Sequence, residues 1–449
     1  MTVELSHWFI SAESNLCRSL FTNQLLTVLG ITVANLKYHK NIIVNYFFIL
    51  FCNLDLTRGL WMIYLASRGF TLLQLGVLEG LFHVTSFLME VPTGAVADLW
   101  GRKISRLLGR VFFLASLALM FFSQEFFLQI LGFVVCAIGY NLESGAGDAL
   151  VYDSLLLDGR NDDYMRINGR KELVYQSAAI AAYLVGGYLA VRSYPLVFSI
   201  SMGIALVSLV SGLFFKEPHI EKTVYAEDQE IKRSRVSFGR KIVISMKRQT
   251  VESLKVVRQQ PRIAFLIIFS ELIFTIMVSL FFYLQNFWKG EGHDEFYIGG
   301  IFAIASLVAG LTSLRAQKIE KKMGERGVLI TMPLLLLVCL WGIALTPWQA
   351  PFYILTGIIE GILIVAISDY INRLIPSQNR ATILSFQSMT FSLFMLVCFP
   401  VIGWVGDTLS LKTAFIGMAV FVTVIYILYL FLARSILTAK ETEESKINH

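Results

Sequence analysis

The sequence predicts an all-α integral membrane protein with about 12 transmembrane helices in two pseudo-symmetric six-helix bundles. Hydrophobic residues make up 56% of the 449 residues and charged residues only 16%. Soluble domains average about 45–50% apolar residues and about 25% charged residues, so this composition is typical of a membrane protein. A spanning helix needs about 20 apolar residues, which leaves room for about twelve spans with short loops. The longest polar stretch, 216–261, divides the apolar runs into two equal groups.

The first 40 residues precede the regular series of spans. Their apolar part, Leu20–Leu36, is short and contains several polar side chains. A spanning helix needs more apolar residues, so we expect an extension that lies at the membrane surface or precedes the true start of the protein. The spans are expected near 41–66, 72–97, 104–123, 126–151, 171–190, 195–215, 262–287, 297–315, 328–347, 351–374, 381–405 and 411–433.

The domain division follows from these runs. The stretch between the two groups of spans is rich in Lys and Arg and could form an amphipathic helix on the inner leaflet. The expected parts are an N-terminal extension, an N-terminal six-helix bundle, a basic cytoplasmic linker, a C-terminal six-helix bundle and a cytoplasmic tail, at 1–40, 41–215, 216–261, 262–433 and 434–449.

Positive charge is concentrated on alternate loops, and the intervening loops carry at most one basic residue each. Since Lys and Arg collect on the cytoplasmic side, we expect a multi-pass protein of the plasma membrane with both termini in the cytoplasm. The net charge of +6 therefore indicates membrane topology and not nucleic-acid binding. The basic clusters lie at 98–110, 158–171 and 315–327, and the first contains Arg102, Lys103, Arg106 and Arg110.

Weak internal repetition supports the division into halves. Glu143 followed by Asp153 in the fourth span matches Glu360 followed by Asp369 in the tenth. Such matches at corresponding spans are what a duplicated six-helix unit leaves behind. Chance similarity between apolar segments is the alternative explanation.

A short polar turn joins the second and third spans and has the pattern Gly94-x-x-x-Asp98-x-x-Gly101-Arg102-Lys103. We expect Gly94 to allow close approach of a neighbouring backbone, and Gly101 to adopt a turn conformation that other residues resist. Asp98 stands where a carboxylate could face the positive start of another helix, near Ala381. The candidate gating residues are Glu90, Gly94, Asp98, Gly101, Arg102 and Lys103.

This turn resembles the loop 2–3 motif of the major facilitator superfamily of secondary transporters. One position departs from it, because the residue after the Asp, usually basic in that family, is Leu99. The stretches Glu90-Val-Pro-Thr-Gly, Ser144–Ser154 and Arg380–Ser385 resemble a bacterial branch grouped with drug:proton antiporters. The resemblance implies two bundles around a central cavity and proton-coupled efflux of small lipophilic or cationic compounds by alternating access.

Charged side chains inside a membrane span are costly, so each is a functional candidate. Asp55 and Arg58 are three residues apart on one expected helix and could pair, either to hold that span or to exchange partners during transport. Glu271 is isolated in apolar sequence and is the leading protonatable residue of the second half, with Glu79 in the first. The candidates for substrate or proton translocation are Asp55, Arg58, Glu79, His83, Glu143, Glu271 and Glu360.

In the second span, Glu79, His83, Ser86 and Glu90 fall on one helical stripe. Facing a cavity, this stripe would supply proton-binding groups, and His83 could titrate near neutrality. A hydrogen-bonded helix contact is the alternative for this histidine. Asp148 and Asp153 lie near the basic loops, where pairing with arginines is expected.

The sequence contains no machinery for catalysis. The five cysteines are scattered without metal-type spacing, and no phosphate-binding loop or His-Glu-x-x-His is present, so we expect no enzyme activity, cofactor or metal. The 35 phenylalanines would suit an apolar cavity or simply lipid-facing helices. The expected partners are a small-molecule substrate, protons and the lipid bilayer, with the chain acting as a monomer. An importer or exporter of a metabolite or lipid, and a non-transporting sensor or scaffold, are the alternatives.

Overall fold

A computed structural model describes residues 37–218, 261–374 and 380–447, and in these ranges the chain is helical without any strand. Among the helices of these ranges, eleven are long and apolar enough to cross a membrane. The all-helical membrane class is therefore confirmed. The expected N-terminal extension and basic linker lie almost entirely outside the described residues.

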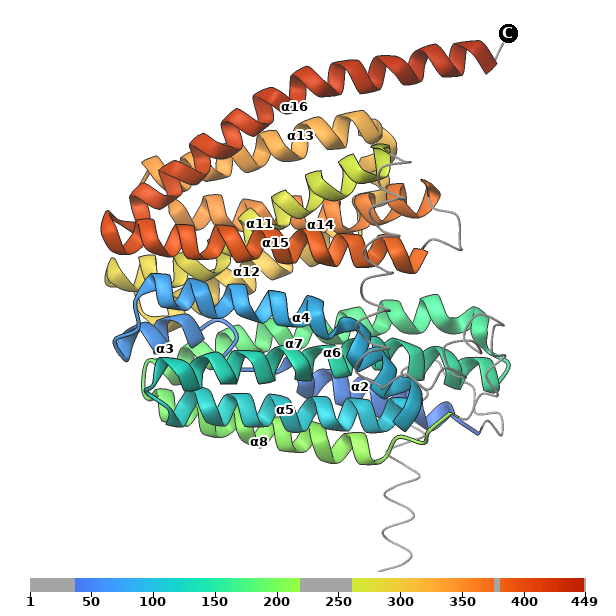
Figure 1. Ribbon diagram of the computed structural model, residues 1–449, viewed down its shortest axis with the longest axis vertical. Coiled ribbons are helices and arrows are strands. Elements are labelled where there is room, and N and C mark those ends of the chain that lie inside the picture. Colours follow the sequence, from blue (N-terminus) through green and yellow to red (C-terminus); the bar gives the residue numbers. More distant parts are fainter. Residues whose placement is uncertain (1–36, 219–260, 375–379, 448–449) are drawn as a thin grey trace, which may run out of the picture.

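The described helices form two groups. Figure 1 shows the N-terminal group, coloured blue to green, beside the C-terminal group, coloured yellow to red. The first group contains α2 (His39–Asn53), α3 (Trp61–Ser67), α4 (Leu72–Trp100), α5 (Arg102–Phe122), α6 (Phe126–Leu157), α7 (Tyr164–Ala190) and α8 (Tyr194–Leu213). The second contains α11 (Pro261–Gly290), α12 (Glu295–Ser313), α13 (Ala316–Leu345), α14 (Gln349–Leu374), α15 (Arg380–Thr408) and α16 (Leu411–Ile447).

The first expected span, 41–66, is not one continuous helix. It is divided into α2 and α3, and the break spans residues 54–60. The Asp55 carboxylate accepts hydrogen bonds from the Thr57 backbone N–H at 3.0 Å and from the Thr57 hydroxyl at 2.7 Å. Such a local side-chain turn competes with helical hydrogen bonding, which explains why the helix stops here. The expectation of a single helix was wrong because apolar length alone does not reveal this turn.

Two other boundaries differ from expectation. α7 begins at Tyr164, before the expected start at 171, and α16 continues to Ile447, through most of the expected tail 434–449. The polar ends of both helices carry no apolar signal, so hydropathy could not place them.

The two ends of the molecule differ in how the bundles meet. We call the end that carries the Lys- and Arg-rich connections at 98–110, 158–171 and 315–327 the basic end, and the opposite end the closed end. At the closed end, α4 packs against α15 and α7 packs against α12. Toward the basic end the two groups of helices separate (Figure 1).

Glycines make the close packing at the closed end possible. A Cβ on Gly76 would lie 2.7 Å from the Phe399 carbonyl oxygen, and one on Gly187 would lie 2.5 Å from that of Glu295. A Cβ on Gly403 would overlap the carbonyl oxygen of Leu72. Small residues let helix backbones approach to contact, the usual device for packing within a membrane. The closed end is therefore sealed by backbone-to-backbone contact between bundles.

Candidate functional site

A cavity lies between the bundles, next to the break in the first span. Its larger part, about 330 Å³, is lined mainly by N-terminal helices, and its smaller part, about 220 Å³, mainly by C-terminal helices. We call these the N-side cavity and the C-side cavity. Arg58 and Phe282 line both, so the two parts meet around them. The charged residues that line one or both parts are Asp55, Arg58, Glu79, Arg110, Glu143 and Glu360.

Arg58 lies in the break between α2 and α3, where the two cavity parts join. Its Nη2 donates a hydrogen bond to the Tyr175 hydroxyl at 2.7 Å, and its guanidinium lies 5.4 Å from the Tyr175 ring centroid. No ion pair within 4 Å joins Arg58 to Asp55 in the described part of the chain. The two residues do not share one helix, and in this conformation the Asp55 carboxylate turns back onto Thr57 while it interacts with Arg58 only at longer range.

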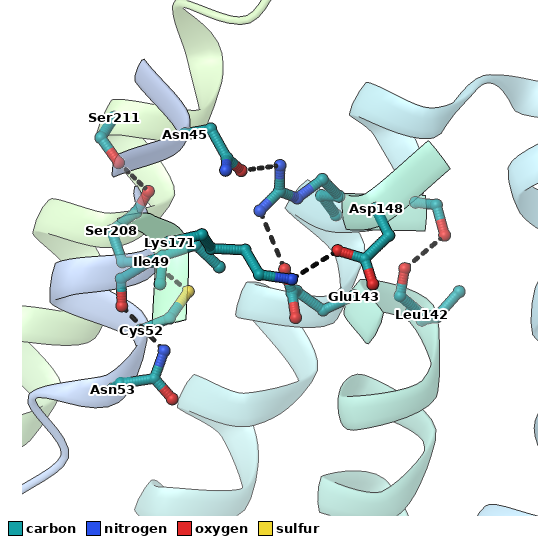
Figure 2. Close-up of polar contacts among 12 residues, drawn as sticks. Asn45, Ile49, Cys52, Asn53, Leu142, Glu143, Asp148, Lys171, Ser208 and Ser211 are labelled. Atoms are coloured by element: carbon teal, nitrogen blue, oxygen red, sulfur yellow. Dashed lines mark hydrogen bonds and ion pairs between the residues drawn. The ribbon is translucent and has the colours of Figure 1, made fainter. Parts of the chain in front are cut away.

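Glu143 is held in a buried ion pair. The Arg106 guanidinium is fully buried, and its Nη2 lies 2.9 Å from the Glu143 carboxylate while its Nη1 donates to Asn45 at 2.8 Å (Figure 2). The same guanidinium lies 4.2 Å and 4.7 Å from the ring centroids of Phe48 and Phe215. An enclosed charge is stabilised by such partners, although the Arg106 Nε has no hydrogen-bond partner among the described residues. Glu143 therefore faces the cavity with its charge already balanced.

The predicted stripe on α4 faces the protein interior over most of its length. Glu79 is buried and lines the N-side cavity, and its carboxylate lies 3.3 Å from His83 Nε2. The His83 ring is 5.1 Å from that of Phe391 on α15, so this histidine sits at the boundary between bundles. Ser86 donates a hydrogen bond to the side-chain oxygen of Asn141 at 2.7 Å. Glu90, the last member, is half-buried.

The two candidate acids of the second half occupy different places. Glu360 lines the C-side cavity and interacts electrostatically with Arg58. Glu271 is 5% exposed and lies outside the residues that line either cavity part. Its carboxylate accepts hydrogen bonds from the Gln387 amide at 2.7 Å and from Ser270 at 3.2 Å. Glu271 is thus a buried acid that is hydrogen-bonded to α15. The apolar residues around it in the sequence could not reveal its partner, Gln387.

The polar turn after α4 is stabilised by a residue that sequence reasoning missed. The Glu217 carboxylate accepts hydrogen bonds from the backbone N–H groups of Arg102 at 2.7 Å and Lys103 at 2.8 Å, the first residues of α5. Gly101 has φ +99°, and a Cβ there would lie 2.9 Å from the Glu217 carboxylate carbon. Gly101 is therefore needed both for its backbone conformation and for room beside this cap.

The remaining motif residues lie nearer the surface. Asp98 is exposed, and the Arg102 Nε lies 2.5 Å from the Asp153 carboxylate. Nothing lies within 4 Å of a Cβ built on Gly94, so the close backbone approach expected there is absent from the described residues. Asp153 thus has an arginine partner as expected, whereas Asp148 pairs with a lysine, Lys171, at 2.6 Å (Figure 2).

Arg110 is a second residue that sequence reasoning missed as a site candidate. The sequence counts it with the basic cluster 98–110, although the expected span 104–123 contains it, and in the structure it lies more than two turns inside α5. It is only 7% exposed and lines the N-side cavity. The spacing of four residues between Arg106 and Arg110 was the available signal for this position, because residues i and i+4 share a helix face.

This geometry defines the class of protein. Two helical bundles in a membrane, closed against each other at one end and sharing a polar and aromatic cavity, are the architecture of a secondary transporter and not of an enzyme. The family model of the Major Facilitator Superfamily matches residues 46–355. The chain belongs to this superfamily and is a transporter of that type.

Relatives agree with this assignment. An uncharacterized MFS-type transporter of Bacillus subtilis (strain 168), YxaM, is 22% identical over 380 residues, which cover 82% of this chain and 90% of the relative. The crystal structure of the nucleoside transporter NupG superposes with a TM-score of 0.69 at 14% identity, over 87% of this chain and 97% of that one. A bacterial homolog of the human lysosomal transporter Spinster, inward-facing and unoccupied, superposes with a TM-score of 0.67 at 15% identity, over 88% of this chain and 96% of that one. These likenesses establish the fold.

Proposed function

We propose that this transporter exports small lipophilic compounds across the plasma membrane in exchange for protons, by alternating access of the cavity between the bundles. The observation that carries this proposal is the position of the cavity: both bundles line it, and it meets the broken first span at Arg58. Broken helices at the boundary between repeats are where secondary transporters bind their substrates. Since one chain supplies the whole cavity, a monomer suffices.

The direction of opening follows from the charge distribution. The basic end is expected to be cytoplasmic, because Lys and Arg collect on that side of a membrane. With the closed end sealed by Gly76, Gly187 and Gly403, the cavity would load from the cytoplasm or from the inner leaflet. The conformation described here is then the inward-facing one.

The lining supports a lipophilic substrate. Aromatic rings from both bundles surround the cavity and would cover flat apolar surfaces of a ligand. The rings that support this most directly are Trp61, Phe82, Phe113, Phe282, Phe302 and Tyr353. A cationic substrate, which the family branch also suggested, receives less support, since Glu143 is neutralised by Arg106 and Glu79 lies beside His83.

Two buried acids are the best candidates for the proton sites. Glu79 with His83 lies at the cavity wall, next to Phe391 of the opposite bundle. Glu271 links α11 to α15 through Gln387. A proton on either carboxyl would weaken or replace a contact of α4 or α15, the two helices that pack against each other between the bundles, which is how protonation can bias a two-state protein.

The test is pH-gradient-driven transport in vesicles, with a panel of fluorescent lipophilic cations, neutral compounds and anions. We expect Glu79→Gln and Glu271→Gln to abolish gradient-driven transport but to retain exchange between internal and external substrate. Asp148→Asn, which removes a surface pair with Lys171, is the matched control and should leave the coupling unchanged. If both glutamine variants keep full gradient-driven transport, proton antiport is wrong, and import of a metabolite becomes the better account.

A further inference from the structure

The N-side cavity contains an arginine, Arg110, that forms no ion pair with any described residue. Arg110 is more than nine-tenths buried, with only 7% of its surface exposed, and its Nε and Nη2 have no hydrogen-bond partner among the described residues. Its guanidinium lies 4.3 Å from the ring centroid of Phe113, a contact that leaves these N–H donors unsatisfied. A buried guanidinium is strongly unfavourable unless it is paired and hydrogen-bonded, so such a group points to a partner from outside the chain.

The neighbouring acids do not fill this role. Glu143 is committed to Arg106 at 2.9 Å, and Glu79 lies 3.3 Å from His83. Asp55 accepts hydrogen bonds from Thr57. Glu360 lies on the other side of Arg58, in the C-side cavity. No ion pair within 4 Å reaches Arg110 from any described residue.

Arg106, one helical turn earlier on α5, shows what a structural arginine looks like in this bundle. Its guanidinium contacts a carboxylate, an amide oxygen and two aromatic rings. Arg110 shares the same helix face, similar burial and the aromatic contact but has no such oxygen partners among the described residues. The Nε of Arg106 also lacks a hydrogen-bond partner among these residues, so the two arginines differ at Nη2, which contacts Glu143 in Arg106 and has no partner in Arg110.

We propose that the transported compound carries an anionic group, a carboxylate on an aromatic or similarly flat apolar body, and that Arg110 binds this carboxylate in the N-side cavity. Arg58, which lines the same cavity and joins it to the C-side cavity, would attract the anion along this path. The aromatic lining would cover the body, and about 330 Å³ accommodates a compound of one or two rings. A guanidinium can bind a carboxylate through two parallel hydrogen bonds, which gives both affinity and orientation.

Three compounds of nearly the same shape test the charge. The purified full-length protein would be titrated with 2-naphthoate, 2-naphthamide and 2-naphthamidine, with its thermal unfolding midpoint as the readout. We expect naphthoate to raise the midpoint at lower concentrations than the neutral amide, and the cationic amidine to bind weakest. If the amide or the amidine binds as well as naphthoate, or if none of the three binds, the proposal is overturned.

Variants then locate the contact. Arg110→Gln should weaken naphthoate binding by about tenfold to a hundredfold, the usual value of a charged hydrogen-bonded pair, and should leave naphthamide binding unchanged. Arg110→Lys should recover part of the loss, because it restores charge without the two-pronged geometry. Arg192→Gln is the matched control, since this exposed arginine also lies over a ring, that of Tyr188, but outside the cavity. Equal naphthoate binding by wild type and Arg110→Gln would contradict the assignment even if the fold is intact.

Since this proposal rests on the cavity being the substrate site of the proposed function, the two must be separable. Binding in detergent needs neither a gradient nor transport. Naphthoate binding through Arg110 without any pH-gradient-driven movement would leave the anion site standing and remove proton-coupled export. Gradient-driven transport of lipophilic cations with no anion binding would leave proton-coupled export standing and remove the anion site.

Discussion

Helices α4 and α15 each carry an aspartate in the last turn, and the two aspartates lie at opposite ends of the molecule. At the closed end, the carboxylate of Asp407, in the last turn of α15, accepts hydrogen bonds from the backbone N–H groups of Leu72 at 2.9 Å and Leu73 at 2.8 Å. These groups begin α4, so an acid of one bundle caps a helix of the other. At the basic end, Asp98 lies in the last turn of α4 and is exposed. Its expected partner is the start of α15 near Ala381, a residue whose side-chain surroundings fall outside the description.

This comparison suggests two symmetric contacts between the bundles, in each of which an Asp caps the start of the opposite helix. We call these contacts latches. Each of two antiparallel helices carries an Asp near its end, placed to face the positive start of the other helix. The Asp407 contact is present in the conformation described here. We expect the Asp98 contact to be the one that holds the basic end shut in the opposite conformation. Transport would then require the two latches to form in turn.

The largest expected effect comes from blocking the closed end sterically. Gly403→Val would force a side chain into the Leu72 backbone, so the packing of the closed end described here could not form. We expect transport to fall to background while the protein still inserts and purifies. Transport in vesicles and the amount of folded protein would be measured together.

Gly203→Val is the matched control, because nothing lies within 4 Å of a Cβ at this membrane glycine of α8. Transport by Gly403→Val at the level of this control would mean that the bundles do not need to meet at α4 and α15.

The next largest effect concerns the basic-end latch. Asp98→Asn removes the charge that would face α15, and we expect transport to fall at least about tenfold with insertion unchanged. Gly101→Val should act differently, by displacing the Glu217 cap from the start of α5 and thereby lowering the thermal stability as well. Normal transport by Asp98→Asn would remove this residue from the gate.

A smaller effect is expected at the Asp407 latch. Asn at this position keeps the shape but loses the charge that faces the start of α4, a change of about 0.3–1 kcal/mol at an exposed site. The population of molecules open at this end should therefore rise by about two- to fivefold. High salt should reduce the difference between wild type and Asp407→Asn, because the contact is exposed. An unchanged population would show that the glycine packing alone keeps this end shut.

The sequence predicted the membrane class well, because apolar length and the positions of Lys and Arg depend only on composition along the chain. It failed where structure is set by contacts between distant residues. The Asp55–Thr57 turn breaks a run that reads as one helix, and Glu217 caps α5 from a position far along the chain. Arg110 was counted only as a topology signal because it follows a basic turn, although the expected span 104–123 contained it.

The candidate site was predicted in the same uneven way. Residue type alone marked Glu79, Glu360 and Arg58 as costly in a membrane, and all three line the cavity. The partners that decide what each charge can do, such as Gln387 beside Glu271, come from other helices. Spacing within one helix could reveal His83 beside Glu79 but no contact between bundles.

The most direct test measures distances at both ends of the same protein. Spin labels at Glu125 and Leu409 would report on the closed end, and labels at Gly159 and Lys321 on the basic end, in a background without native cysteines. Alternating access predicts two populations, one short at the closed end and long at the basic end, and one with the reverse arrangement. Gly403→Val should enrich the second population. Distances at the two ends that lengthen and shorten together, or that stay fixed in Gly403→Val, would contradict the account.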